Sequence, residues 1–220
     1  MSKSTYFIGI AGNIGVGKTT MTDIIADRFG WRPFYESVID NPYLEDFYED
    51  MKRWSFNLQV YFLSHRFRTH KTMTESGFSA IQDRTIYEDV EIFARNLYEM
   101  GNMSQRDWDN YRALFEIMTS YLKKPDLILY LRASVDTLLT RIKKRSRGFE
   151  SNISPEYIYR LNISYERWIK RIQGEFPVKI VETDNFNIFE DTDQLEILLR
   201  EIRQFCPVCE YFGQFLCKYQ

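Results

Sequence analysis

The stretch GNIGVGKT, residues 12–19, decides the fold, because it fits the pattern G-x-x-x-x-G-K-[ST] at every defined position. It follows a short apolar run of strand-forming residues at 6–11 and precedes helical periodicity over 18–29. In this setting the glycines let successive backbone amides point at phosphate oxygens, and the helix N-terminus adds a favourable field for an anion. The stretch therefore predicts a loop that holds the phosphates of a nucleotide.

Two side chains of this loop add chemistry of their own. Lys18 supplies a mobile positive charge for the β- and γ-phosphates, and the Thr19 hydroxyl can bind Mg²⁺. We therefore expect ATP and Mg²⁺ as ligands. The residues expected to contact ATP here are Gly12, Asn13, Ile14, Gly15, Val16, Gly17, Lys18, Thr19 and Thr20. The chain shows no NKxD-type guanine-reading segment, which leaves an energy-coupling ATPase or a kinase.

Short apolar segments alternate with helical periodicity along the rest of the chain. Strands are expected at 6–11, 33–37, 79–84, 126–131 and 178–182. A turn that leads into a helix is expected within 40–51, followed by a long helix that runs to about 74, and further helices are expected at 18–29, 87–99, 104–122, 135–144, 155–172 and 193–204. This alternation predicts an α/β fold of the P-loop kinase type, with a five-stranded parallel sheet and helices on both faces. Ligands of such folds bind beyond the carboxyl ends of the strands.

Composition limits the classes of protein to which the chain can belong. Its 220 residues, of which 44% are hydrophobic, suffice for one domain with a substantial core. A net charge of −2 gives no reason to expect a nucleic-acid polymer as partner. The start does not resemble a signal peptide, and no apolar run approaches the roughly 18–20 residues that span a bilayer. We expect a cytoplasmic protein that binds no membrane.

The chain ends in a segment that carries all three cysteines, Cys206, Cys209 and Cys217. An odd number of cysteines in a tail is no disulfide framework, and a zinc site usually needs four ligands, which CPVC at 206–209 does not supply alone. We therefore expect one domain over residues 1–205, with a reduced tail at 206–220.

The acceptor side of a kinase needs a group that assists proton loss from the attacking hydroxyl. Glu36, at the end of the second predicted strand, is a candidate for that base. Asp83 and Arg84 end the third strand. Asp83 can reach Mg²⁺, and Arg84 can orient Glu36 or steady the transferring phosphoryl group.

Two helices bring polar and aromatic side chains to the same crevice. Gln59, Phe62 and Arg66 share one face of the long helix, and Asp89 and Phe93 share a face of the helix that follows the third strand. Their donors and acceptors could read the edge of a heterocycle, and the Phe93 ring could stack on it.

Basic residues gather at the end of the helix predicted at 135–144. Arg141, Lys144, Arg145 and Arg147 precede a glycine. They could form a solvated helix end that the helix dipole favours. Beside a phosphate loop, we favour a lid at about 141–152 whose arginines stabilise transition-state charge.

Six segments together resemble the deoxynucleoside kinase family, most of all its bacterial deoxyadenosine kinase branch. They are GNIGVGKTT, ESVIDNPYL, FYEDMKRWSFNLQVYFLSHRFR, QDRTIYEDVEIFARNLY, PDLILYLRAS and RIKKRSRGFE with the following SPEYIYRLNISYERWI. The resemblance covers roughly residues 5–190, with the motifs in family order. It implies a homodimer built through long helices.

The resemblance also implies roles for single residues. Glu36 matches the general base for the 5′-hydroxyl, Arg84 the arginine of the D/E-R-S type motif, and Asp83 its acidic partner near Mg²⁺. Thr85 stands where serine is common, and Leu58 where some relatives have Phe. The further matches are Tyr48 and Glu150 for the sugar 3′-hydroxyl, Gln59 for the base, Arg141, Arg145 and Arg147 for the lid, and Asp184 and Phe186 for the adenine of ATP. Arg66 and Asp89 match a pair found in members that accept purines or cytosine.

These observations predict ATP-dependent 5′-phosphorylation of a deoxynucleoside, with deoxyadenosine favoured, and with Lys18, Glu36, Arg84 and Arg145 as the catalytic set. One alternative is a nucleoside monophosphate kinase of the thymidylate kinase type, although Glu36 would repel an anionic acceptor. Another is the regulatory subunit of a heterodimeric deoxynucleoside kinase. The sequence leaves open the choice among deoxyadenosine, deoxyguanosine and deoxycytidine, the donor preference, feedback inhibition and the dimer interface.

Overall fold

The architecture of the chain comes from a computed structural model that describes residues 5–35, 41–145, 153–186, 188 and 190–206. In this part of the chain a parallel sheet has the order β2-β3-β1-β4-β5. Its strands are β1 (Phe7–Gly12), β2 (Arg32–Phe34), β3 (Ala80–Asp83), β4 (Leu127–Arg132) and β5 (Val178–Glu182). The predicted α/β fold with a five-stranded parallel sheet is therefore confirmed.

The central strand β1 explains where the phosphate loop lies. All six of its residues are buried, and it pairs with β3 on one side and β4 on the other. Ile10 lies opposite Asp83, and Gly12 lies opposite Leu131. Because the pairing is parallel, the loop after β1 and the polar end of β3 meet at the same edge of the sheet.

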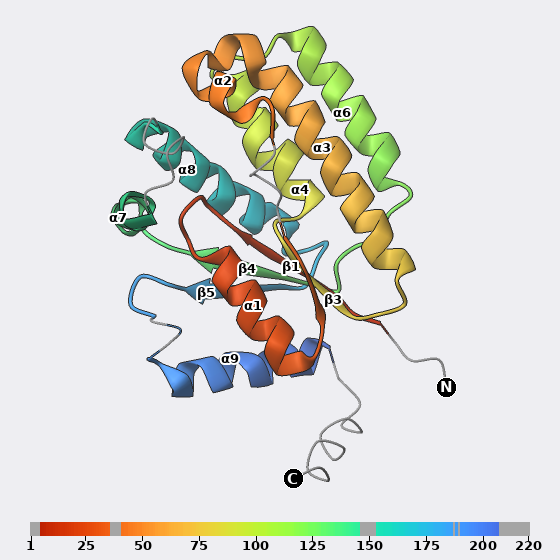
Figure 1. Ribbon diagram of the computed structural model, residues 1–220, viewed down its shortest axis with the longest axis vertical. Coiled ribbons are helices and arrows are strands. Elements are labelled where there is room, and N and C mark those ends of the chain that lie inside the picture. Colours follow the sequence, from red (N-terminus) through yellow and green to blue (C-terminus); the bar gives the residue numbers. More distant parts are fainter. Residues whose placement is uncertain (1–4, 36–40, 146–152, 187, 189, 207–220) are drawn as a thin grey trace.

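Helices cover both faces of the sheet (Figure 1). Helices α1 (Lys18–Phe29) and α9 (Thr192–Phe205) lie on one face, and α3 (Met51–Glu75) and α8 (Pro155–Ile172) lie on the other. The remaining helices are α2 (Leu44–Glu49), α4 (Ile86–Glu88), the π-helix η1 (Asp89–Ala94), α5 (Arg95–Glu99), α6 (Gln105–Thr119) and α7 (Val135–Arg145). No helix in the described part of the chain is long and apolar enough to cross a membrane.

The structure departs from the sequence prediction at several element bounds, and the helix predicted at 104–122, for example, ends at Thr119. The described part of the second strand ends at Phe34, before the predicted end at residue 37. The predicted helix 87–99 is divided into α4, η1 and α5, with a π turn from Asp89 to Ala94. A tertiary bond accompanies this wider turn, since the Asn96 side-chain amide, which also donates to Ile92 O four residues back, donates to Ser164 Oγ on α8. Local periodicity does not encode such long-range contacts.

The core supports the site from two sides. The main cluster fills the space between the sheet and its helices, and it includes Cys206, which the sequence assigned to the tail. Burial raises the pKa of the Cys206 thiol to about 12. A second cluster joins α3, η1 and α6 through Leu63, Val90 and Tyr111. It holds the helices that carry Arg66 and Asp89 together.

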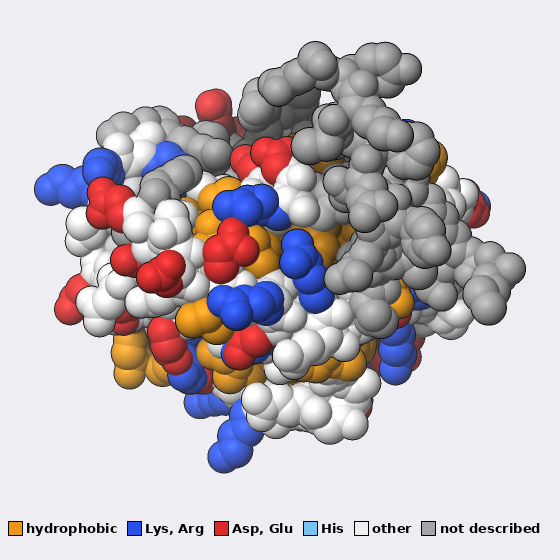
Figure 2. Space-filling model, turned by 90° about the horizontal axis from the view of Figure 1, so that it is seen from below, with side chains coloured by type: hydrophobic (Ala, Val, Ile, Leu, Met, Phe, Trp, Pro, Cys, Tyr) orange, Lys and Arg blue, Asp and Glu red, His pale blue; other side chains and the backbone are white. Residues whose placement is uncertain are grey.

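The face seen from below in Figure 1 shows acidic and basic side chains interspersed with apolar ones (Figure 2). Helix α9 contributes ion pairs of this kind, between Glu196 and Arg28 at 2.8 Å and between Glu201 and Lys179 at 2.7 Å. Charges that alternate in sign produce no field of a single sign.

Candidate active site

The phosphate loop has the backbone that its sequence predicts. Gly15 and Gly17 have φ angles of +84° and +102°, which disfavour residues with a side chain. A Cβ on Gly15 would also lie 2.8 Å from Ile142 Cγ1 on α7. Because the N-cap Gly17 has no side chain, it gives no capping bond to the first-turn amides of α1. Those donors can therefore serve an anionic ligand.

Two side chains of the loop, Asn13 and Lys18, form hydrogen bonds to α8 or within the loop itself. The Asn13 amide donates to Ile158 O at 3.1 Å and to Asn162 Oδ1 at 3.3 Å, and its own oxygen accepts from Ile14 N at 2.8 Å. Lys18, which is buried, donates from Nζ to Asn13 O at 3.1 Å. Asn13 thus gives the loop its shape, while the Lys18 ammonium lies inside the loop.

The Thr19 hydroxyl and Asp83 meet at the edge between β1 and β3. Thr19 Oγ1 donates to Asp83 Oδ2 at 2.6 Å. The other carboxylate oxygen, Oδ1, is buried and has no hydrogen-bond partner among the described residues. Mg²⁺ prefers hydroxyl, carboxylate and phosphate oxygens and keeps several waters, so this pair fits the ion.

Arg84, directly after β3, has an unusual backbone and a fully enclosed side chain. Its φ is +69°, the one positive φ among described residues other than glycine, which costs about 1–3 kcal/mol. Its NH1 donates to the Tyr165 hydroxyl at 2.7 Å and lies 3.6 Å from Glu88 Oε1. The guanidinium also lies 4.3 Å from the centre of the Phe93 ring.

Glu88 is a member of the site that the sequence analysis missed. Its side chain is fully buried and accepts from Gly12 N at 3.2 Å, Thr85 N at 2.8 Å and the Tyr165 hydroxyl at 2.8 Å. One carboxylate thus joins the start of the phosphate loop to Arg84. The T-x-x-E pattern over residues 85–88 is a capping box and could have indicated a helix start there. Nothing local indicated the bonds to Gly12 or Tyr165.

Two of the residues predicted to read the base, Arg66 and Asp89, meet beside Arg84. Arg66 Nε donates to Asp89 Oδ2 at 2.7 Å, and Arg66 NH1 donates to the Arg84 carbonyl at 3.1 Å. Gln59 lies on α3, as Arg66 does, and is 3% exposed. Its Oε1 has no hydrogen-bond partner among the described residues. Tyr48 is half-buried against Phe47, with ring centres 5.2 Å apart. A buried amide oxygen without a partner is what a ligand group would satisfy.

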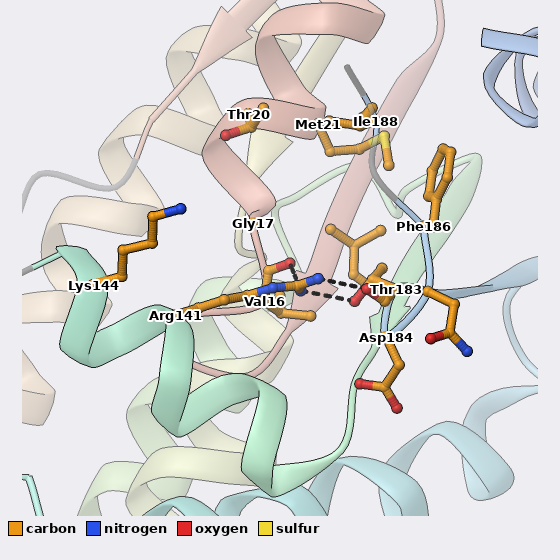
Figure 3. A pocket seen from close by; sticks show the side chains of 12 residues that line it. Val16, Gly17, Thr20, Met21, Arg141, Lys144, Thr183, Asp184, Phe186 and Ile188 are labelled. Atoms are coloured by element: carbon orange, nitrogen blue, oxygen red, sulfur yellow. Dashed lines mark hydrogen bonds between the residues drawn. The ribbon is translucent and has the colours of Figure 1, made fainter. Parts of the chain in front are cut away.

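A cavity of about 620 Å³ adjoins the phosphate loop (Figure 3). It is lined by Val16, Gly17, Thr20, Met21, Leu131, Arg141, Lys144, Thr183, Asp184, Asn185, Phe186 and Ile188. It therefore brings together loop residues, the α7 arginine and the segment after β5, and six of the lining residues are among those predicted to contact ATP: Val16, Gly17, Thr20, Arg141, Asp184 and Phe186. That ATP binds here stays a prediction. Lys144 lines the cavity, although it was not among the predicted ATP contacts.

Arg141 and Asp184, which line this cavity, both form hydrogen bonds within the protein. Arg141 donates to Val16 O at 3.2 Å and to the Thr183 carbonyl at 2.5 Å, bonds that Figure 3 draws. Asp184 accepts from Ser134 N at 2.9 Å. Burial would raise the pKa of Asp184, but the bonds from Ser134 and Thr137 hold it below its usual value. Phe186 is half-buried and offers an apolar wall.

Three predicted residues, Glu36, Arg147 and Glu150, lie outside the described residues, as does the lid beyond residue 145. Arg145 ends α7 with an exposed side chain. Among the residues that the structure describes, no three His, Cys, Asp or Glu side chains gather as metal ligands.

Comparisons with known proteins agree with this geometry. A family model described as "Deoxynucleoside kinase" matches residues 8–207. The chain is 40% identical to a deoxyadenosine/deoxycytidine kinase of Bacillus subtilis over 89% of this chain and 90% of that protein. It is 36% identical to a deoxyguanosine kinase of the same organism, over 90% and 96%. Its fold resembles a deoxyadenosine kinase from M. mycoides with bound dCTP, at a TM-score of 0.80 and 32% identity, covering 90% and 99%.

Proposed function

Because the chain belongs to the deoxynucleoside kinase family, we propose that it transfers the γ-phosphate of ATP to the 5′-hydroxyl of a deoxynucleoside, with deoxyadenosine preferred. The observation that carries this proposal is a direct hydrogen bond between the residues that would hold the base and the arginine that would face the transferring phosphoryl group. The buried Arg66–Asp89 pair, which would face the base, donates to the carbonyl of Arg84, which would face the phosphoryl group.

On the donor side, the amides of the phosphate loop and the first turn of α1 would bind the phosphates. Lys18 would neutralise charge on the β- and γ-phosphates. Thr19 and Asp83 would hold Mg²⁺, which neutralises charge on the phosphates when it is bound. Arg141, Asp184 and Phe186 would border the adenine in the cavity beside the loop. Lid residues Arg145 and Arg147 would add positive charge over the transferring group.

On the acceptor side, Glu36 would accept the proton of the 5′-hydroxyl as that oxygen attacks in line. Arg84 would steady the transferring phosphoryl group. Tyr48 and Glu150 would bind the 3′-hydroxyl, and Phe93 would pack against the base. Gln59 would use on the base edge its amide nitrogen and its oxygen, which accepts no bond from the residues that the structure describes.

The preference for a purine or cytosine over thymine is argued from Arg66 and Asp89. The two side chains are 5% and 2% exposed and form a hydrogen-bonded ion pair at 2.7 Å. A buried pair offers donors and acceptors in fixed positions, so a base that satisfies both is strongly favoured over one that leaves either group unpaired. The relatives named above include kinases for deoxyadenosine, deoxycytidine and deoxyguanosine, so the order among these three is for experiment.

We further propose one domain over residues 1–205, a cytoplasmic location, and a homodimer through the long helices. Helix α6 supports the dimer, because Ile117 is 61% exposed and Tyr121, just beyond the helix, is 79% exposed. Exposed apolar side chains at the end of an outer helix and just beyond it are suited to contact with a second copy.

A phosphoryl-transfer assay tests the proposal. Purified protein with ATP and Mg²⁺ would be offered deoxyadenosine, deoxyguanosine, deoxycytidine, thymidine and dTMP separately. We expect turnover of the deoxynucleosides, fastest with deoxyadenosine and slowest with thymidine. Turnover of dTMP alone would support the thymidylate kinase alternative. Turnover of none would support the regulatory-subunit alternative, and Lys18→Met is the control for contaminating kinase.

A further inference from the structure

The Arg66 guanidinium donates to two targets within the described part of the chain. Nε donates to the Asp89 carboxylate at 2.7 Å, and NH1 donates to the main-chain carbonyl of Arg84 at 3.1 Å. Both bonds are buried, because Arg66, Asp89 and Arg84 are between 2% and 5% exposed. Reading a base explains the first bond. It does not require the second.

The second bond falls on the most strained peptide of the site. Arg84 has a left-handed backbone with φ of +69°, which a residue with a Cβ adopts only when its surroundings hold it there. The amide of Arg84 donates to Ile10 O on β1 at 3.0 Å, and its carbonyl accepts from Arg66. The residue is thus fixed to the sheet at its nitrogen and to α3 at its carbonyl.

This backbone conformation determines where the Arg84 guanidinium points. The side chain reaches the Tyr165 hydroxyl at 2.7 Å and the face of the Phe93 ring at 4.3 Å. If φ relaxed to the right-handed or extended region, the Cα–Cβ direction would turn, and the guanidinium would leave these partners.

We infer that Arg66 is a positioning residue for Arg84, in addition to its proposed contact with the base. The inference rests on the proposed function. Through the Arg66–Arg84 bond, recognition of the base and placement of the phosphoryl-transfer arginine depend on the same guanidinium. A base that misplaces Arg66 is then phosphorylated slowly even when it is bound.

The test is a double-mutant cycle on turnover, with Arg66→Lys as the first variant. Lysine keeps the positive charge beside Asp89, but it lacks the planar fork that reaches two targets. At saturating deoxyadenosine we expect kcat to fall about 10- to 100-fold, the effect of a misplaced reacting group. In an Arg84→Ala background, the same substitution should change kcat by less than about 2-fold, because the residue it positions is gone.

Gln59→Leu is the matched control, since Gln59 is a proposed base contact for which no bond to Arg84 is found among the described residues. Gln59→Leu should raise KM for deoxyadenosine. It should change KM and kcat by the same factors in the wild-type and Arg84→Ala backgrounds. If Arg66→Lys lowers kcat by the same factor in both backgrounds, or does not lower it, the coupling is wrong.

Two further outcomes are separable. If Arg66→Lys does not fold, the variant Arg66→Met with Asp89→Met takes its place in the cycle, because it removes both buried charges together. If the wild-type protein phosphorylates no deoxynucleoside, the proposed function fails and the coupling fails with it. Active wild-type protein with additive factors overturns the coupling alone.

Discussion

Replacing Glu88 by alanine tests the buried network at the residue with the most partners. The fully buried Glu88 carboxylate accepts bonds from Gly12 N, Thr85 N and the Tyr165 hydroxyl, and lies 3.6 Å from Arg84 NH1. Alanine leaves these donors without that acceptor and removes the negative charge beside a buried arginine.

The expected loss of stability follows from these contacts. A buried donor left without an acceptor costs about 1–3 kcal/mol, and breaking a buried ion pair costs about 3–5 kcal/mol. The contributions overlap, and water can enter the space left by the side chain, so we expect about 4 kcal/mol for Glu88→Ala. This is a large part of the roughly 5–15 kcal/mol that stabilises a typical domain.

Urea unfolding at neutral pH measures this loss, with Glu88→Gln as the matched control. Glutamine keeps the shape and one acceptor oxygen, so we expect about half the effect, roughly 2 kcal/mol. KM for ATP should also rise in Glu88→Ala, because Gly12 begins the phosphate loop. A loss below about 1 kcal/mol in Glu88→Ala would show that the network does not hold the site together.

Three further predictions concern the base, the specificity pair and pH. Glu36→Gln should lower kcat about 100-fold or more with little change in ATP binding, and near-normal turnover would exclude Glu36 as the general base. Replacing Arg66 and Asp89 together by methionine should lower the ratio of deoxyadenosine to thymidine turnover, and an unchanged ratio would contradict their role in base reading. Burial lowers the pKa of His70 from 6.5 to about 4, so the unfolded chain binds more protons between these values. The contribution of His70 to the free energy of unfolding should therefore be fully present above pH 6.5 and be lost, by up to about 3 kcal/mol, as pH falls toward 4. The slope of the unfolding free energy against pH should be smaller in His70→Phe. Equal slopes in the two proteins would refute this assignment.

Much of the fold could be predicted from the sequence because its signals are local. The pattern at 12–19 places a loop between a strand and a helix, and the apolar runs at 126–131 and 178–182 lie within one residue of β4 and β5. The helix at 155–172 begins with Ser154 as N-cap and Pro155, and the structure has the same bounds.

What the sequence did not show depends on contacts between distant residues. Glu88 bonds to Gly12 and Tyr165 across 76 and 77 positions, and no local pattern encodes such a pairing. The left-handed backbone of Arg84 is equally hidden, because glycine would be the expected residue at a positive φ. Helical spacing and then family resemblance assigned Arg66, Asp89 and Gln59 to the base. The geometry brings the first two together, and their roles stay proposals.

Trp168, which packs against the ring of Tyr165, gives this site an intrinsic fluorescent probe. The Tyr165 hydroxyl bonds to Glu88 and Arg84, while the Tyr165 ring meets the indole of Trp168 edge-on, with centres 6.3 Å apart. Trp168 is 3% exposed, so its emission should depend on nearby charges more than on bulk solvent. Nucleotide binding that shifts the Arg84 guanidinium should therefore change the fluorescence of Trp168, one of the four tryptophans, and a Trp168→Phe variant identifies its share of the signal. Ligand association could then be followed in stopped flow without a dye, a label or a coupled enzyme.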